Sequence, residues 1–297
     1  MISVIVVNHN RSALLKRCLE SLRGQSLMDF EVIVVDNASS DDSVEMVKTY
    51  FQDAKVIQNT TNLYFSKAYN QGMEASYGSF ILCLNNDAYL EKDFLKEALF
   101  AIGKDEKIGM VSGKILREDK LTIDSTGLFL GRNRKPIERG YGLPSYAKAT
   151  EGRRDTGLYD KEEYIFGVSG SCAFYRKKML EDIKDKHGYF DERFEMYYED
   201  LDLSWRAQKK GWKAYYTPKA IAYHKRSSGF FTIPDDLKKK YIRNRYLCMK
   251  KNDSLKDVIW NIPFILIYEI KLWGYMMYNY FRSRILNIEK TPARSGI

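Results

Sequence analysis

The chain opens with two short apolar runs rich in β-branched residues, at positions 3–7 and 30–37. Runs of this length and composition are typical of parallel strands that are buried on both faces. Between them, apolar residues recur at helical spacing, and Ser12 and Gly24 stand where a helix would begin and end. The pattern predicts a β-α-β unit. The apolar positions of its helix are Leu14, Leu15, Cys18, Leu19 and Leu22.

The same alternation continues along the first third of the chain. A helix is predicted at 39–51, a strand at 55–59, a helix at 66–78 and a strand at 79–87. Alternating strands and helices predict an α/β fold with a doubly wound sheet. In such sheets ligands bind beyond the carboxyl ends of the strands, so polar residues at those ends are the first candidates for a site.

The second half of the chain is less regular. Residues 117–164 are rich in Gly, Arg and Lys, and we interpret them as a partly extended, mobile insertion near the site. A plain surface loop is the alternative, but a loop of this length usually has a function. A strand at 172–175, a helix from about Asp200 to Lys210 and a last strand ending at His224 follow.

Apolar and aromatic residues dominate positions 258–281, but Pro263 and several polar residues interrupt them. A membrane-spanning helix needs about 20 mostly uncharged apolar residues. The segment fits better in the plane of a membrane surface, with its Trp and Tyr side chains at the level of the headgroups. A pair of core or dimer helices is the alternative. We therefore expect one domain at 1–250 and a helical segment at 251–297 that associates with a membrane or a second copy.

The 297 residues carry a net charge of +9, which is unevenly spread. From Ser204 onward, 20 Lys and Arg stand against 6 Asp and Glu, so the preceding part is net acidic. A basic, aromatic C-terminal third favours an anionic partner such as a membrane surface or nucleic acid; a solvated helix surface is the alternative. The four cysteines show no paired spacing, which fits a reducing compartment. The N-terminus lacks a basic lead and a cleavage site, so we expect a first strand there and not a signal peptide.

Polar side chains follow the first two predicted strands. Asn8 and His9 come after the first strand, and Asp36 ends the second. Asp36 could accept a hydrogen bond from a nucleobase imide or a ribose hydroxyl, and His9 could stack on a base. A helix cap and a structural histidine are the alternatives. These positions predict a nucleotide pocket over the first two strands.

Asn85, Asn86 and Asp87 follow a buried apolar run. A carboxylate beside two amides forms an oxygen-lined position suited to Mg²⁺ or Mn²⁺, which takes its other ligands from substrate phosphates. The alternative is a turn, because Asn and Asp are also turn residues.

A second acidic cluster, Glu199, Asp200 and Asp202, begins a predicted helix. Acidic residues at a helix start complement the helix dipole, which explains Asp202. A carboxylate beside a substrate hydroxyl acts as a general base, and His224 could be a second metal ligand. A base, a metal-bound diphosphate and a nucleotide pocket together indicate group transfer from a nucleotide-linked donor.

In their order and spacing, these stretches resemble the inverting family 2 glycosyltransferases over roughly residues 1–250. The resemblance is carried by SVIVVNHNR, EVIVVDNASSDDSVE, NLYFSKAYNQGMEASYGSFILCLNND and GYFDERFEMYYEDLDLSWRAQKKGWKAYYTPKAIAYH. The stretches IDSTGLFL, FGVSGSCAFYRKKML and YIRNRYLCMKK are similar to the bacterial rhamnosyltransferase-like branch of that family.

The resemblance implies a GT-A fold, in which a Rossmann-like nucleotide-sugar half (1–115) joins an acceptor half (116–250). It also implies a metal motif in which Asn85 replaces the first aspartate of the family pattern, and it assigns the roles of general base and metal ligand. The expected site residues are Asp200 and Glu199 for catalysis; Val7, Asn8, His9, Asp36, Asn62, Asn70, Asn85 and Asn86 for the nucleotide; Asp87 and His224 for the metal; and Gly170, Ser171 and Trp205 for the acceptor.

The resemblance thus implies a metal-dependent inverting glycosyltransferase of bacterial surface polysaccharide synthesis. We expect dTDP-rhamnose as the first donor and UDP-sugars next, a glycan or lipid-linked acceptor, and Mn²⁺ or Mg²⁺ as cofactor. We expect a peripheral location at the cytoplasmic face of the cell membrane, no nucleic-acid partner, and a homodimer as a further option. The alternatives are a sugar nucleotidyltransferase, which would need a Gly-rich triphosphate loop after the first strand, and a basic scaffold or nucleic-acid-binding protein.

Overall fold

The computed structural model describes residues 1–145, 159–226 and 234–289. The chain divides into two compact units, and the division after Asn252 lies close to the predicted boundary at residue 250. The first unit contains Met1–Leu130 and Pro136–Asn252, and the second contains Gly131–Lys135 and Asp253–Ile297.

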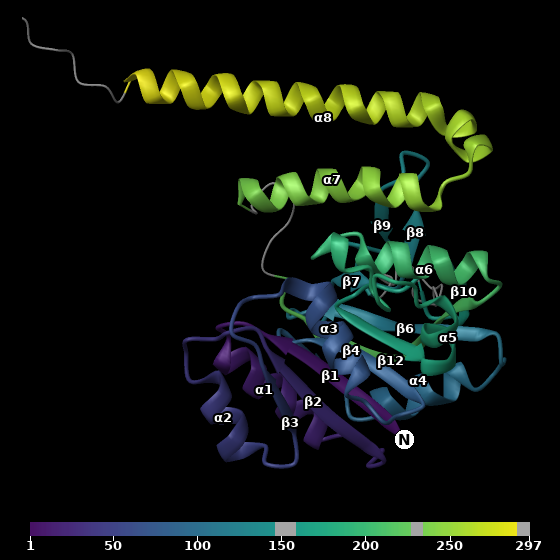
Figure 1. Ribbon diagram of the computed structural model, residues 1–297. Helices are drawn as coiled ribbons and strands as arrows, with labels where there is room; N and C mark the ends of the chain where they lie inside the picture. The colour runs from purple at the N-terminus through teal and green to yellow at the C-terminus, as the bar shows by residue number, and fades with distance from the viewer. Residues whose placement is uncertain (146–158, 227–233, 290–297) are drawn as a thin grey trace, which may run out of the picture. The chain divides into compact units, whose positions relative to one another are not determined.

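The first unit is built on one β-sheet, whose N-terminal half consists of four parallel strands in the order β3-β2-β1-β4 (Figure 1). Three helices join these strands, so the predicted alternation of strands and helices is confirmed. In chain order the elements are β1 (Ile2–Asn8), α1 (Ser12–Arg23), β2 (Phe30–Asp36), α2 (Ser43–Tyr50), β3 (Lys55–Gln58), α3 (Tyr64–Glu74) and β4 (Phe80–Asn85).

The starts of α1 and α2 differ from the prediction. Ser12 does not cap α1 with its side chain; its backbone N–H donates to Asp41 Oδ2 at 3.0 Å instead. The helix predicted at 39–51 begins only at Ser43, because Asp41 Oδ1 accepts from the Ser43 N–H at 3.1 Å and holds the preceding residues in a turn. One carboxylate therefore organises the entry to both helices.

The sheet continues without a break into the second half of the unit. β11 (Cys172–Arg176) pairs antiparallel with β4, and the order then runs β6 (Ile108–Arg117), β12 (Lys213–His224) and β10 (Glu163–Ile165). β5 (Ala88–Leu90) pairs with β12, and β7 (Ile123–Ser125) pairs with β6. The two predicted halves therefore share one sheet, which is mixed and not purely parallel.

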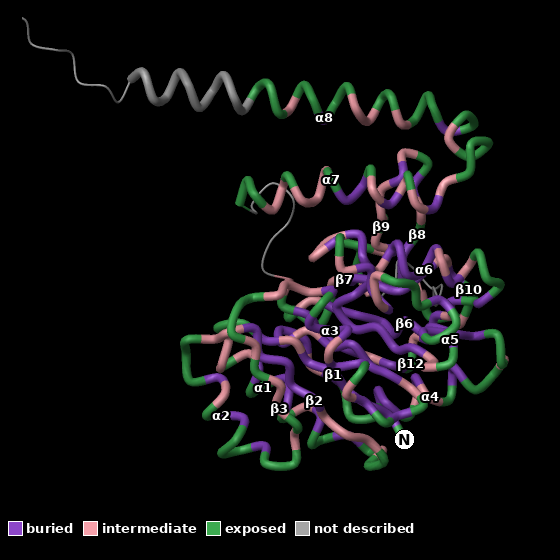
Figure 2. Tube along the Cα trace, in the orientation of Figure 1, coloured by how far each residue is buried: buried purple, intermediate pink, exposed green. Residues whose placement is uncertain are grey.

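Helices cover both faces of this sheet (Figures 1 and 2). Successive strand residues point to opposite faces, so Val4 and Val6 belong to one core cluster and Ile5 to the other. All three side chains are fully buried, and each contributes about 1.5–3 kcal/mol through its burial. The remaining helices of the unit are α4 (Phe94–Ile102), α5 (Lys177–Ile183), the 3-10 helix η1 (Glu192–Phe194), α6 (Glu199–Lys209) and α7 (Asp235–Asn252).

Residues 117–164, predicted as a partly extended, mobile insertion near the site, form strands in the part that the structure describes, and some of them line the cavity discussed below. β7 joins the main sheet, and β8 (Leu128–Leu130) pairs with β9 (Pro136–Glu138) in a hairpin. Residues 123–128 are all buried. They stay inside because β7 adds to β6 and because the carboxylate of Asp124, within this run, has charged partners. Residues 146–158 lie outside the described residues.

All four cysteines are reduced thiols with buried side chains. Cys18, Cys83 and Cys172 lie in the two core clusters that flank the sheet, and burial raises the pKa of each of these thiols. Cys248 lies on α7, in a separate cluster with residues of α6. Buried thiols of this kind are inert in the native state.

The second unit consists of α8 (Leu255–Glu289) and the tip of the β8–β9 hairpin. Arg134 Nη2 pairs with Asp253 Oδ1 at 2.7 Å, and the Arg132 guanidinium lies 3.8 Å from the centroid of the Phe264 ring. The described part of the chain contains no helix with the length and apolar character needed to span a membrane.

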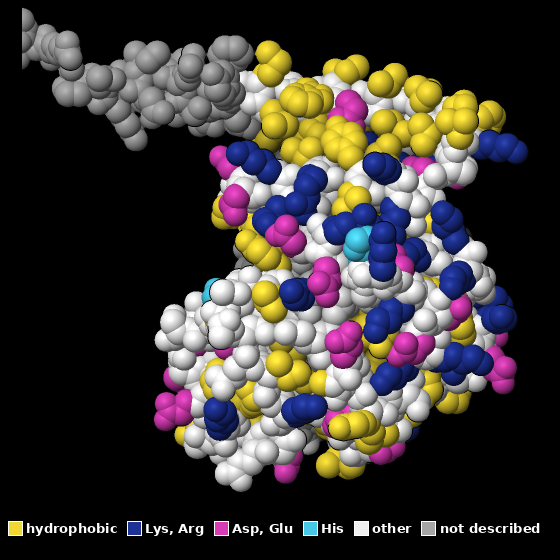
Figure 3. All heavy atoms as spheres, viewed as in Figure 1, with side chains coloured by type: hydrophobic (Ala, Val, Ile, Leu, Met, Phe, Trp, Pro, Cys, Tyr) yellow, Lys and Arg dark blue, Asp and Glu magenta, His cyan; other side chains and the backbone are white. Residues whose placement is uncertain are grey.

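Apolar side chains remain exposed along α8 and gather on its surface in Figure 3. Many of them recur every three or four residues, which places them on one side of the helix. We call this row the apolar stripe; it comprises Leu255, Ile259, Ile262, Leu266, Ile270, Trp273 and Met277, which are 41% to 77% exposed.

Candidate active site

A cavity of about 680 Å³ lies where β4 and β12 end and α6 begins. It brings residues from distant parts of the sequence to the carboxyl edge of the sheet, as the strand pattern predicts. The polar residues of its wall include Arg11, Asn85, Asn86, Asp87, Glu138, Ser169, Ser171, Glu199, Asp200, His224, Arg226 and Tyr241.

The two predicted metal ligands face each other in this cavity. His224 Nε2 lies 3.2 Å from Asp87 Oδ1, and His224 Nδ1 lies 2.8 Å from Asp124 Oδ2. Burial lowers the pKa of His224, but the hydrogen bonds and charges of Asp124 and Asp87 outweigh it and raise that pKa to about 9. Burial raises the pKa of Asp87, but His224 and then Arg11 outweigh it and lower that pKa below its usual value.

The donor atoms of Asp87 and His224 fit a divalent ion. Asp124 can fix the proton on Nδ1 and leave Nε2 for a metal, as in carboxylate–histidine–metal triads. Two ligands about 2.1 Å from one ion at neighbouring octahedral corners are about 3 Å apart, close to the distance between Oδ1 and Nε2. The described residues contain no cluster of three or more acidic, His or Cys side chains arranged around a metal position. Phosphate and water oxygens would therefore supply most of the ligands, which is common for Mg²⁺.

Asp200 lies in the first turn of α6 and is fixed by two backbone N–H groups. Gly170 N donates to Oδ2 at 3.0 Å, and Leu201 N donates to Oδ1 at 2.7 Å. Burial raises the pKa of Asp200 although these hydrogen bonds oppose the shift. A Cβ atom at Gly170 would lie 3.1 Å from the Phe65 ring. The absence of a side chain at this position therefore lets the backbone of Gly170 lie close to Phe65. A half-buried carboxylate with a raised pKa is suited to take a proton from a hydroxyl.

Glu199 differs from its neighbour Asp200. It is 6% exposed, and its Oε2 has no hydrogen-bond partner within the described ranges. Burial, with the charge of Asp200, raises the pKa of Glu199 well above its usual value. The charge of Asp200 thus makes ionisation of its neighbour Glu199 less favourable.

The segment before α6 has an unusual backbone. Tyr197 and Tyr198 have φ angles of 69° and 73°, a left-handed conformation that costs about 1–2 kcal/mol for a residue with a side chain. Asn244 of α7 is fully buried, and its Nδ2 donates to the backbone oxygens of Phe194 at 2.6 Å, Met196 at 2.9 Å and Tyr197 at 3.0 Å. α7 therefore holds the segment that positions the candidate base.

Arg226 contacts two acidic residues of the candidate site, Asp124, which holds His224, and Glu138. Its Nε lies 2.9 Å from Asp124 Oδ1, and its Nη2 lies 3.1 Å from Glu138 Oε1. The same Glu138 oxygen accepts from Ser169 Oγ at 3.0 Å, whereas the buried Oε2 has no hydrogen-bond partner among the residues described. Burial, against the opposing charge of Arg226, raises the pKa of Glu138 to about 7.

Sequence reasoning missed several of these residues. Asp124 and Asn244 lie in the stretches IDSTGLFL and YIRNR, which the resemblance singles out without giving them a role. Asp124 is the single charged residue between Leu121 and Gly131, a signal that could have identified it. Glu138 and Arg226 carry no comparable signal, because each stands among many other charged residues.

At the ends of β1 and β2, the predicted nucleotide residues hold one another. Asp36 Oδ1 accepts from Asn8 Nδ2 at 3.3 Å, and Asp36 Oδ2 accepts from Ser39 N at 2.9 Å. Asn86 Nδ2 donates to Asn8 Oδ1 at 2.7 Å. These bonds join the residues at the ends of β1, β2 and β4 to one another. A nucleobase contact of Asp36 stays a prediction. His9 is exposed, with its Nδ1 2.8 Å from Asn37 O, and its stacking role also stays a prediction.

Two predicted contacts are corrected by the structure. The Asn70 amide is buried and bonded to the Phe190 backbone, donating to its oxygen at 2.8 Å and accepting from its N–H at 2.9 Å, so it is not directed to a nucleotide. Trp205 is 8% exposed and packs edge-on against Phe166 with ring centroids 6.2 Å apart, so it belongs to the core and not to the acceptor wall.

Two further predicted nucleotide residues lie outside the wall of the cavity. Val7 lies at the end of β1 against a core cluster. Asn62 is exposed, and its Oδ1 accepts from Tyr64 N at 2.8 Å in a turn. Their nucleotide contacts stay predictions.

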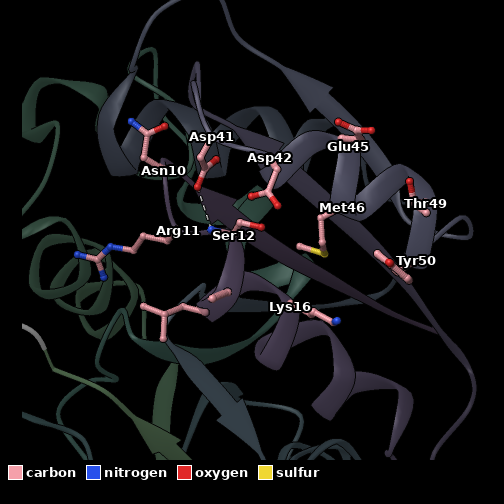
Figure 4. Close-up of a pocket in the computed structure, with 12 residues that line it drawn as sticks. Asn10, Arg11, Ser12, Lys16, Asp41, Asp42, Glu45, Met46, Thr49 and Tyr50 are labelled. Atoms are coloured by element: carbon pink, nitrogen blue, oxygen red, sulfur yellow. Dashed lines mark hydrogen bonds between the residues drawn. The ribbon is translucent and has the colours of Figure 1, made fainter.

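A second pocket, of about 940 Å³, lies between α1 and α2 (Figure 4). Arg11 lines both pockets, but in Figure 4 its side chain extends away from Asp41 and Asp42. None of the candidate catalytic residues lines this second pocket, so the 680 Å³ cavity is the candidate active site.

Two curated relatives illustrate the sequence similarity. The chain is 23% identical over 228 residues to the poly-beta-1,6-N-acetyl-D-glucosamine synthase of Staphylococcus epidermidis, covering 75% of this chain and 49% of the relative. It is 28% identical over 120 residues to a PGL/p-HBAD biosynthesis glycosyltransferase of Mycobacterium bovis, covering 39% of this chain and 47% of the relative. The chain thus spans less than half the length of these curated relatives.

Solved structures resemble the fold at low sequence identity. Staphylococcus aureus TarS 1-349 in complex with UDP-GlcNAc matches with a TM-score of 0.55 and 20% identity, over 85% of this chain and 67% of that chain. GalNAc-T7 with UDP, GalNAc and Mn²⁺ matches with a TM-score of 0.61 and 15% identity, over 82% of this chain and 48% of that chain. These likenesses show a shared GT-A fold.

Family models extend this similarity through the candidate site. Residues 160–288 match the model described as Glycosyl transferase family group 2. Residues 3–184 match the model described as Glycosyl transferase family 2. Because that second match takes in more than half of the chain, including β1, β4 and the loop that carries Gly170, the chain belongs to glycosyl transferase family 2.

Proposed function

We propose that this protein is an inverting glycosyltransferase that moves a sugar from a nucleoside diphosphate donor to a hydroxyl group of a glycan acceptor. The observation that carries the proposal is the meeting of Asp200, with its raised pKa, and the Asp87–His224 pair in one cavity. A base and a diphosphate position on opposite sides of one space are what a single displacement needs.

In the proposed reaction, Asp200 accepts the proton of the acceptor hydroxyl. The hydroxyl oxygen attacks the anomeric carbon of the donor sugar, and the new C–O bond forms as the bond to the phosphate oxygen breaks. The nucleoside diphosphate leaves on the opposite face, so the configuration inverts. The backbone N–H groups of Gly170 and Leu201 keep the Asp200 carboxylate in place.

Asp87 and His224 would hold the divalent ion, Mn²⁺ or Mg²⁺. When bound, such an ion offsets the negative charge that develops on the departing diphosphate. Asp124 orients the His224 ring through Nδ1, and Arg226 in turn holds Asp124. Asp87, which the chain retains, would serve as a metal ligand although Asn85 replaces the first aspartate of the usual motif.

The donor and acceptor follow from similarity alone. TarS is solved in complex with UDP-GlcNAc, and GalNAc-T7 with UDP and GalNAc, so UDP-sugars are strong candidates. dTDP-rhamnose remains the donor that the rhamnosyltransferase-like stretches favour. A role in bacterial surface polysaccharide synthesis is in keeping with the poly-N-acetylglucosamine synthase among the relatives.

Calorimetric titration with UDP, dTDP and GDP, each with and without Mn²⁺, tests this proposal. We expect one nucleotide to bind in a metal-dependent way, and Asp87→Ala to remove most of the metal-dependent part. Transfer from the matching sugar nucleotide should give a product of inverted anomeric configuration by NMR. A folded protein that binds none of the three nucleotides would refute the proposal and leave a scaffold as the better account.

The second unit carries a further part of the proposal, a peripheral location at the cytoplasmic face of the membrane with a lipid-linked acceptor. The apolar stripe of α8 runs from Leu255 to Met277, and only four of these 23 positions are charged: Lys256, Asp257, Glu269 and Lys271. Trp260 and Trp273 are 78% and 56% exposed, and Trp favours the headgroup level of a bilayer. An exposed row of this kind is suited to lie in a membrane interface.

Cosedimentation with vesicles of neutral phosphatidylcholine, with or without 30% phosphatidylglycerol, tests the membrane role. We expect binding that strengthens with the anionic lipid and falls at least about tenfold in Ile270→Asp. Met28→Asp is the matched control, because Met28 is a 72% exposed apolar residue of the first unit. If the protein does not bind vesicles and is a dimer by analytical ultracentrifugation, the apolar stripe would instead be the contact surface for a second copy.

A further inference from the structure

The two oxygens of Asp87 are held by neighbours that differ in how firmly they are fixed. Arg11 Nη1 lies 2.7 Å from Oδ2, and His224 Nε2 lies 3.2 Å from Oδ1. The side chains of Asp87 and His224 are each 8% exposed, whereas that of Arg11 is 39% exposed. His224 is held in addition by Asp124. Of these two partners of Asp87, Arg11 is therefore the one with the more exposed side chain.

Arg11 is placed at the entrance to the candidate active site. It stands between the end of β1 and the start of α1, and its side chain lines the cavity that contains Asp87 and Asp200. Asp41 and Asp42 line the second pocket with Arg11, yet the guanidinium extends away from both in Figure 4 and pairs with Asp87. The local sequence thus brings a long, partly exposed cation to the predicted metal ligand.

This pairing has a consequence for metal binding. A buried carboxylate without a counter-charge is strongly unfavourable, and Arg11 adds such a charge beside His224 when no ion is present. A divalent ion on Asp87 would lie close to the guanidinium, and the two positive groups would repel each other. An anion bound between the ion and the guanidinium would offset this repulsion. A diphosphate is such an anion, because its oxygens match the guanidinium fork.

We propose that Arg11 is a donor-binding residue that exchanges partners: it neutralises Asp87 before the donor arrives and moves to the donor diphosphate when the metal ion takes its place. The inference rests on the proposed function and adds a residue that the family resemblance does not assign. Its consequence is that metal and nucleoside diphosphate bind synergistically, with Arg11 supplying part of the coupling.

A binding cycle measures this coupling without any turnover. The dissociation constant of Mn²⁺ is determined by electron paramagnetic resonance of the unbound ion, with and without saturating nucleotide, using whichever of UDP, dTDP and GDP binds best. Direct contacts of Mn²⁺ with phosphate oxygens are possible in every variant. A difference between Arg11→Gln and the unmodified protein in the coupling of Mn²⁺ and nucleotide binding therefore reports the contribution of Arg11. We expect Arg11→Gln to bind Mn²⁺ alone more tightly, to bind the nucleotide more weakly, and to lose about fivefold or more of the coupling.

Arg17→Gln is the matched control. Arg17 lies on α1, six residues after Arg11, is 47% exposed and pairs with Glu118 at 2.8 Å, but it does not line the cavity. Its coupling should stay that of the unmodified protein. Arg11→Lys should fall between the unmodified protein and Arg11→Gln, because Lys keeps the charge and loses the fork.

The outcomes separate the two proposals. Unchanged coupling in Arg11→Gln, with nucleotide still bound by the unmodified protein, would overturn the role of Arg11 and leave the proposed function standing. If the unmodified, folded protein binds none of the nucleotides, the proposed function fails and the role of Arg11 fails with it. Thermal unfolding of each variant checks that a change in binding does not reflect loss of the fold.

Discussion

Replacing Asn244 by aspartate would test whether α7 holds the segment that precedes the candidate base. The substitution keeps the shape of the side chain and removes the two amide hydrogens that three backbone oxygens share at 2.6 to 3.0 Å. Each buried group left without its partner costs about 1–3 kcal/mol, and the new carboxylate would face carbonyl oxygens in a fully buried position. We expect a loss of about 4 kcal/mol in the free energy of unfolding at pH 7.

Thermal and urea unfolding measure this loss. For a unit of this size, 1 kcal/mol corresponds to about 2–4 °C, so the Tm should fall by about 8–16 °C. Burial raises the pKa of a carboxyl group, and the introduced carboxyl group regains one donor when it is protonated. The stability deficit of Asn244→Asp should therefore shrink as the pH falls from 7 to 5.

Asn62→Asp is the control for Asn244→Asp, because Asn62 is exposed and its Oδ1 only accepts a hydrogen bond, from Tyr64 N at 2.8 Å. It should change stability by less than about 0.5 kcal/mol. If Asn244→Asp lowers the Tm by less than about 2 °C, the role assigned to α7 is refuted.

Three further changes test other parts of the molecule. Asp200→Asn should lower turnover by about 10²–10⁴-fold while nucleotide affinity by calorimetry stays within about twofold, and retained turnover would remove Asp200 as the base. Glu138→Gln should gain stability relative to the unmodified protein as the pH rises from 5 to 8: the raised pKa of about 7 means that the carboxyl loses stability on ionising, whereas Gln does not titrate. A Tm difference that is constant over this range would contradict that expectation. Gly72→Ala should destabilise the fold by about 1–3 kcal/mol in urea unfolding, since its Cβ would lie 2.4 Å from Ile5 Cγ2; an unchanged midpoint would show that the core yields easily.

The first half of the fold was predictable because its signals are local. Apolar residues at helical spacing and β-branched runs fix the elements from β1 to β4, and short connections fix their order. The meeting of Asp87 and His224 was predictable as well, because both stand at the ends of strands and the carboxyl ends of neighbouring strands meet at one edge of the sheet. No partner needed to be known for either inference.

Asp202 shows where this reasoning stops. Its place at the start of α6 suggests a helix-dipole role, yet the side chain is fully buried. It accepts from Arg206 Nε at 2.8 Å, and from Asn252 Nδ2 at 2.7 Å and Lys251 Nζ at 3.0 Å on α7. Two of these partners lie about 50 residues away in the chain, so no local pattern could reveal them.

Asn70 fails as a prediction for the same reason. An amide at a helix position near a predicted site looks available to a ligand, and only the tertiary structure brings the Phe190 backbone to it. Gly188 makes this approach possible, since a Cβ there would lie 2.1 Å from Asn70 Nδ2 and the backbone φ is +103°. The partner of Asn70 is a loop about 120 residues further along the chain.

The separation of the four cysteines turns them into reporters of local opening. Cys18, Cys83 and Cys172 are buried beside the sheet, whereas Cys248 is buried where α7 packs against α6 and the segment before it. A thiol reagent added to the native protein would thus modify Cys248 whenever α7 detaches, and the other three only on global unfolding. The ratio of the two labelling rates would measure how often α7 releases the segment before the base, in a protein that needs no engineered label.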